Sequence, residues 1–154
     1  MLELTLAQAL HTLAAVIWVG GMVFAYVFVR PAAGALDGPD RQTLWRGVFA
    51  RFFPVVAVCV GILLVTGYYM MFAAHGGFIG AGLHIHLMQG LGLVMMAIFA
   101  HVYLAPWRRF RGAVDAGDRP TGAQQIERIR RLVGLNLTLG LIVVALATSG
   151  QYWA

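Results

Sequence analysis

Four long stretches of this 154-residue sequence contain no Asp, Glu, Lys or Arg, and this pattern restricts the possible folds more than any other. A helix needs about 20 consecutive apolar residues to cross the hydrocarbon core of a bilayer. Only 11% of the residues are charged and 60% are hydrophobic, whereas a soluble domain has about 25% charged residues. We therefore predict an all-α integral membrane protein with one domain, residues 1–154, and spans at about residues 4–30, 52–74, 83–107 and 131–152.

All 11 basic residues are arginines, and they lie in the segments that follow the first and third apolar stretches. Since basic residues are enriched in loops that stay in the cytoplasm, both segments should face the cytoplasm, and both termini should face the periplasm. Four helices joined by short links favour an antiparallel four-helix bundle. The arginines would then contact headgroups of the lipid bilayer, so we predict no nucleic-acid partner despite the net charge of +5.

Prolines predict where the helices begin and end. Arg30-Pro31 should end the first helix, and Pro54 should lie in the first turn of the second, where a missing N–H costs little. Residues 33–47 and the polar residues 112–125 are predicted to be loops.

Five histidines are the residues most suggestive of chemistry: His11, His75, His84, His86 and His101. His11 and His101 fall inside apolar stretches, where a charged side chain costs roughly 2.5–3.5 kcal/mol on insertion scales. Imidazole is a common ligand of metals and of haem iron. We therefore expect these histidines to bind a metal or a haem.

The depths of the histidines suggest haem ligation. The first and third predicted helices run in the same direction, so His11 and His86 could meet near the outer face and hold one iron, with His84 as a substitute for His86. His101 lies 15 residues after His86, roughly 22 Å deeper at 1.5 Å per residue. We therefore predict one or two haem b groups, which would make the protein a cytochrome b-like electron carrier or membrane oxidoreductase.

The first helix offers further haem contacts. At 100° per residue, His11, Trp18 and Met22 fall on one stripe. Met22 could then be the second ligand of a haem held by His101, because His/Met pairs also ligate haem iron. A quinone or a periplasmic redox partner would exchange electrons with such a protein.

A copper site at the outer face is the alternative. His75, His84, His86 and Met88 lie toward that face, and imidazole with thioether suits copper, above all Cu(I). If both are helical, His84 and His86 point about 160° apart, so His84 would have to precede the helix. A third interpretation is a non-catalytic bundle that serves as a subunit or assembly factor.

The first helix also resembles a known family. His11, six residues, Trp18 and then Gly20-Gly21 resemble the opening helix of the copper resistance protein D family, and Thr66-Gly67 and the arginines after the third helix resemble its layout. The resemblance implies a multi-pass protein of the bacterial inner membrane that is associated with copper resistance.

The same pattern is similar to the haem-binding membrane protoporphyrinogen oxidases. His101 matches a histidine in their third helix, and Arg131 with Asn136 loosely matches their fourth. This second resemblance implies haem binding.

Overall fold

The computed structural model describes residues 1–152, and its regular structure in that range is helical. The elements, in chain order, are α1 (Leu2–Val23), the π-helical η1 (Phe24–Val29), α2 (Arg30–Ala32), the 3-10 turn η2 (Ala33–Ala35), α3 (Gly38–His75), α4 (Leu83–Leu104), α5 (Pro106–Asp115), α6 (Arg119–Ser149) and the 3-10 turn η3 (Gly150–Tyr152).

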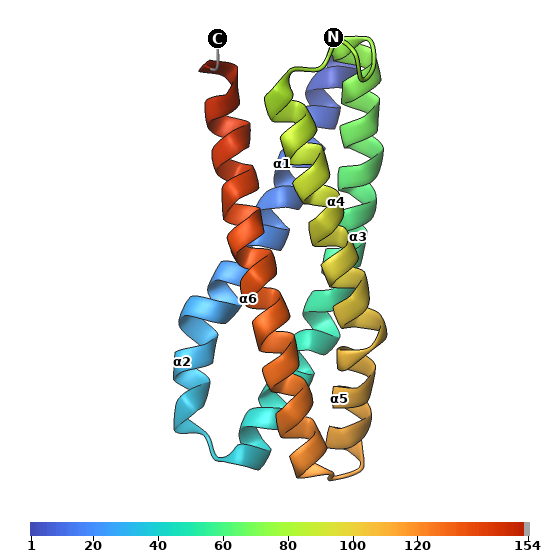
Figure 1. The fold of residues 1–154 in the computed structure, drawn as a ribbon. Coiled ribbons are helices and arrows are strands. Elements are labelled where there is room, and N and C mark those ends of the chain that lie inside the picture. Colours follow the sequence, from blue (N-terminus) through green and yellow to red (C-terminus); the bar gives the residue numbers. More distant parts are fainter. Residues whose placement is uncertain (153–154) are drawn as a thin grey trace.

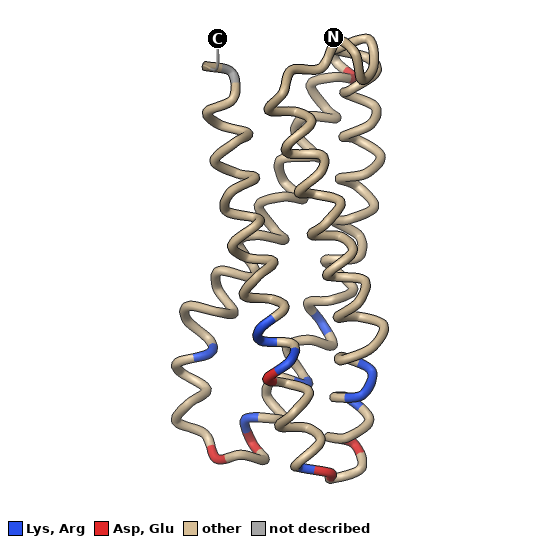
Figure 2. Tube along the Cα trace, in the orientation of Figure 1, with Lys and Arg blue, Asp and Glu red and all other residues tan. Residues whose placement is uncertain are grey.

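The described chain has four helical segments long and apolar enough to cross a membrane: Leu2–Ala35, Gly38–His75, Leu83–Asp115 and Arg119–Ser149. The prediction of an all-helical protein with four membrane-length helices is therefore confirmed. Helices satisfy their own backbone hydrogen bonds, as hydrocarbon requires. The four segments lie side by side, with the N-terminus and the end of α6 at one end of the molecule (Figure 1). The arginines lie toward the opposite end (Figure 2).

Both segments that were predicted to be loops are largely helical. Within residues 33–47, α3 already begins at Gly38, because the Asp37 side chain accepts a hydrogen bond from the Asp40 amide at 3.0 Å and Pro39 fits the first helical turn. Within residues 112–125, α5 continues to Asp115 and α6 begins at Arg119, where the Asp118 side chain accepts from the Thr121 amide at 3.1 Å. These Gly-Pro and Asp-Arg-Pro sequences are helix starts and not loops.

The two proline predictions are also wrong. Pro31 does not end the first helical segment, which continues through α2 and η2 to Ala35. The π-helical stretch η1 comes just before it and changes the hydrogen-bonding register, and Pro31 lies at the start of α2, where its missing N–H matters little. Pro54 is inside α3, because this helix begins 16 residues earlier.

Two buried clusters hold the bundle together. The first lies between α1, α3, α4 and α6 and includes Trp18, Met22, Cys59 and Met95. The second lies nearer the arginine-bearing end and is aromatic. In it the rings of Phe49 and Phe53 stack with centroids 4.9 Å apart, and the rings of Trp45, Trp107 and Phe110 pack around them.

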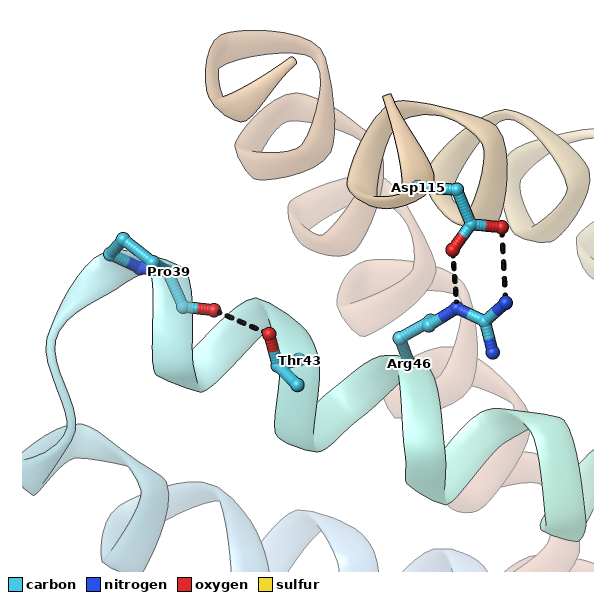
Figure 3. A network of polar contacts seen from close by, with 4 residues as sticks. All are labelled: Pro39, Thr43, Arg46 and Asp115. Atoms are coloured by element: carbon cyan, nitrogen blue, oxygen red, sulfur yellow. Dashed lines mark hydrogen bonds and ion pairs between the residues drawn. The ribbon is translucent and has the colours of Figure 1, made fainter. Parts of the chain in front are cut away.

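An ion pair joins α3 to α5 at the arginine-bearing end. The Arg46 guanidinium donates Nε to one carboxylate oxygen of Asp115 at 2.7 Å and Nη2 to the other at 3.0 Å (Figure 3). One turn nearer the start of α3, the Thr43 hydroxyl donates to the Pro39 carbonyl. Both partners of the pair are partly exposed, and solvent screens an exposed ion pair, so it adds little to stability.

Phe110 gives a direct test of this aromatic cluster. Phe110→Ala removes a fully buried ring and should lower the free energy of unfolding by about 3–5 kcal/mol, measured by reversible denaturation in mixed micelles. Phe28→Ala deletes the same side chain from a position that is 60% exposed and should change it by less than about 1 kcal/mol. Equal losses in the two variants would contradict the packing described.

Candidate functional site

His11 forms the most specific polar contact inside the bundle. Its Nδ1 lies 2.8 Å from the Thr66 hydroxyl of α3, and that hydroxyl lies 2.6 Å from the Ile62 carbonyl. A hydroxyl has one proton, and the carbonyl can only accept, so Thr66 donates to Ile62. Nδ1 of His11 must therefore donate to Thr66, and the lone pair of the imidazole stays on Nε2.

Gly67 lets the His11 ring approach α3. A Cβ atom at this position would lie 3.2 Å from His11 Cε1 and 3.7 Å from Nδ1. The contact with Cε1 would be tighter than most side-chain contacts, so a larger residue would push the ring away. Thr66 and Gly67 thus form a seat for one face of the imidazole, with Thr66 itself buried.

This arrangement fits a metal ligand. A metal-binding histidine donates its second ring N–H to an oxygen, which fixes the orientation of the ring and leaves the other nitrogen to bind the ion. His11 has this arrangement in a half-buried position. Its free Nε2 suits borderline and soft ions such as copper and zinc.

The remaining outer histidines contact different neighbours. Nε2 of His86 donates to the Phe78 carbonyl at 3.0 Å, which ties the start of α4 to the loop before it. The side chain of His84 packs against the end of α6, where a Cβ on Gly150 would lie 2.6 Å from it. His75 is exposed in the last turn of α3.

The predicted copper ligands lie at the end of the bundle that holds the N-terminus: His75, His84, His86 and Met88. Within residues 1–152 the structure places no group of three or more His, Cys, Asp or Glu side chains where they could hold one metal ion. The outer copper site therefore stays a prediction, and its ligands are not assembled around one point here.

The structure separates the residues predicted to hold the inner haem. His101 is exposed on α4, whose buried residues are Met95 and Val102. Met22 is buried, only 2% exposed, in the first cluster beside Trp18. Trp18 and Met22 face the core, but His101 does not turn toward them.

The space beside Trp18 and Met22, where the inner haem was predicted, is small. Trp18, Met22 and Asn136 line a cavity of about 20 Å³, whereas cofactor pockets are typically about 300–1,000 Å³. Haem ligation by His11, His86 and His101, with His84, Met22 and Trp18 in support, thus stays a prediction from sequence.

The same core contains sulfur donors. Met22, Cys59 and Met95 belong to one buried cluster, and Cys59 is a free thiol. Met22 lies 11 residues after His11, about 16 Å farther along α1. In the same region the Asn136 Oδ1 atom is buried and has no hydrogen-bond partner among the described residues.

Sequence reasoning identified His11 but missed Thr66 as its partner. The signal was present, because a threonine hydroxyl in the middle of an apolar helix needs an acceptor and can offer its oxygen to a neighbouring helix. The neighbouring glycine marks the place where another helix comes close.

The comparisons with known proteins give one match. The family description copper resistance protein D matches residues 46–149, about two thirds of the chain. The match begins after α1 and includes Thr66, Gly67, Cys59 and Met95. No curated protein and no solved structure matches the chain.

The hydroxyl of Thr66 should determine which nitrogen of His11 carries the proton. Nitrogen-15 NMR of protein labelled at histidine should show the Nδ1-protonated form of His11. Thr66→Val removes the acceptor with little change in size, so it should abolish this preference. Thr138→Val removes a hydroxyl that bonds only within α6 and should leave the His11 resonances unchanged. An Nε2-protonated His11 in the unsubstituted protein would contradict the assignment.

Proposed function

The chain belongs to the copper resistance protein D family, so it is a copper resistance membrane protein, and we propose that it binds Cu(I) as a cargo at His11. Copper is here the substance that the protein handles and not a resident cofactor. The proposal favours the copper interpretation over haem-based electron transfer, because the family match points to copper resistance and the cavity beside Trp18 and Met22 has a volume of only about 20 Å³.

The observation that carries the proposal is the seat of His11 on α3. Thr66 fixes the imidazole with Nδ1 protonated, and this leaves Nε2 to bind an ion. Imidazole nitrogen and sulfur are the donors that copper prefers among protein groups, and hard ions such as Mg²⁺ prefer oxygen. The chemistry of the seat therefore agrees with the family.

Sulfur atoms near His11 are the proposed additional donors. Met70 lies one turn beyond Thr66 on α3, on the same side of the helix, and it is half-buried. Deeper in the bundle lie the thiol of Cys59 and the thioethers of Met22 and Met95. We propose that Cu(I) passes from His11 toward this cluster.

The proposed direction follows from charge. Arginines are enriched at the cytoplasmic end of membrane helices, and here they lie at the end opposite to the termini (Figure 2). His11 then lies in the periplasmic half of an inner-membrane protein whose four helices alternate in direction. His75, His84, His86 and Met88 would surround the place where copper enters, each binding it in turn and not as one fixed site.

Competition with a Cu(I)-specific chelator, under reducing conditions in detergent, tests the proposal. We expect the unsubstituted protein to bind Cu(I) and His11→Ala to weaken binding by 100-fold or more. Thr66→Val should weaken it by about 10–100-fold, the usual effect of losing a hydrogen bond that orients a metal ligand. His101→Ala is the matched control, because His101 is exposed on α4, and it should bind like the unsubstituted protein.

Two results would contradict the proposal. One is an unsubstituted protein that binds no Cu(I). The other is equal binding by the His11→Ala and His101→Ala variants. A Soret band in protein from haem-replete cells that is lost in His11→Ala would instead favour the haem interpretation.

A further inference from the structure

A cavity that the copper proposal does not use lies at the arginine-bearing end. It has a volume of about 420 Å³ and lies between the segment η1–α2–η2, the first turns of α3 and the first half of α6. In Figure 1 the α2 segment bows away from α3 and α6 at this level. A volume of this size is typical of a site for a small organic ligand.

The charge of the cavity lining is positive. Arg30, Arg41 and Arg130 line it, together with one acidic residue, Glu127. Glu127 already binds the guanidinium groups of Arg130 and Arg131. Within residues 1–152, Arg30 and Arg41 have no acidic partner, so two guanidinium groups remain to bind an anion.

One of these guanidinium groups is held in place. The Arg30 guanidinium carbon lies 5.0 Å from the centre of the Tyr26 ring, over its face. Such a cation–π contact limits the motion of the side chain. The group can still bind an anion through its edge, and arginine binds phosphate through two parallel hydrogen bonds.

The rest of the lining is apolar. Trp45 and Phe49 of α3 stack with centroids 5.1 Å apart, and Ile129 and Val133 of α6 line the same cavity. A small hydrated anion would gain nothing from such a surface, whereas the glycerol and acyl parts of a lipid would bury apolar area against it.

The depth of the cavity matches a headgroup layer. Arg30 lies 28 residues after the start of α1, about 42 Å along the helical segment, and Arg130 lies 19 residues before the end of α6, about 29 Å along it. The hydrocarbon core is about 30 Å thick and the whole bilayer about 40–45 Å. Both lengths reach the edge of a hydrocarbon core that begins at the opposite helix ends, so we expect Arg30 and Arg130 near the lipid headgroups.

We propose that this cavity binds the phosphate group of an anionic glycerophospholipid from the leaflet at the arginine-bearing end, with Arg30 and Arg41 on the phosphate and Trp45 and Phe49 against its apolar part. Basic pockets between membrane helices commonly recognise anionic lipid headgroups. The site is separate from His11 and does not depend on the copper proposal.

Quenching by brominated lipids tests the proposal, because Trp45 lines the cavity. The protein in detergent is titrated with brominated phosphatidylglycerol or with brominated phosphatidylcholine, and tryptophan fluorescence is recorded. We expect saturable quenching by phosphatidylglycerol at concentrations at least tenfold lower than by phosphatidylcholine. Trp45→Phe should remove the saturable component.

Three variants separate the cavity from general surface charge. Arg30→Gln with Arg41→Gln should weaken the binding of phosphatidylglycerol by about 30-fold, with each arginine contributing roughly fivefold. Gly34→Leu should also weaken the binding of phosphatidylglycerol, and it changes no charge. Gly34 lines the cavity, and an added Cβ would have no atom within 4 Å, so the leucine side chain has room to occupy the space of the lipid. Arg108→Gln with Arg109→Gln removes two exposed arginines outside the cavity and should change binding less than twofold.

The proposal is overturned by equal quenching from the two lipids, or by equal losses in the two double-arginine variants. It is also overturned if inorganic phosphate displaces phosphatidylglycerol at the same concentration as the lipid itself, because the cavity would then be a site for free phosphate. Saturable binding that Gly34→Leu and the Arg30/Arg41 variant both weaken supports a lipid site.

Discussion

The absence of solvent in the hydrocarbon core is the constraint on which this structure depends. A polar group there must find its partner within the protein. The backbone satisfies this requirement by forming four membrane-length helices. The Thr66 hydroxyl satisfies it by donating its proton to the Ile62 carbonyl. Its oxygen then accepts a hydrogen bond from His11 of α1. The same requirement therefore sets both the fold and the protonated nitrogen of the imidazole.

The two ends of the bundle present different chemistry. Toward the termini lie four histidines and several thioethers, which are donors for a soft or borderline cation. Toward the other end lie the 11 arginines, which favour anions. Buried between them is a cluster with a thiol and two thioethers, and among the described residues no acidic or basic side chain is buried beside it. A hard cation would find no charged oxygen ligand in that cluster, whereas Cu(I) could bind its sulfur atoms.

The number and type of helices could be predicted from the sequence, because a long, uncharged apolar stretch crosses a membrane as a helix. The ends of the helices could not, because Asp37 and Asp118 act as N-caps within segments whose glycines and prolines resemble loops. The cavity beside Arg30 was missed in part for the same reason, since one of its walls, with Gly34, Arg41 and Trp45, lies in a segment that was predicted to be a loop. The rotation of α4 could not be predicted from the sequence. Rotation depends on which neighbour a helix packs against, and packing turns Met95 and Val102 of α4 inward and leaves His101 exposed.

The central claim is that His11 binds copper within the bundle. X-ray absorption spectroscopy of the Cu(I)-loaded protein tests it most directly, because the fine structure identifies the donor atoms. The account predicts a shell that contains one imidazole nitrogen together with sulfur, and the loss of the imidazole scattering in His11→Ala but not in His101→Ala. A shell of oxygen atoms alone, or an imidazole signal that persists in His11→Ala, would contradict it.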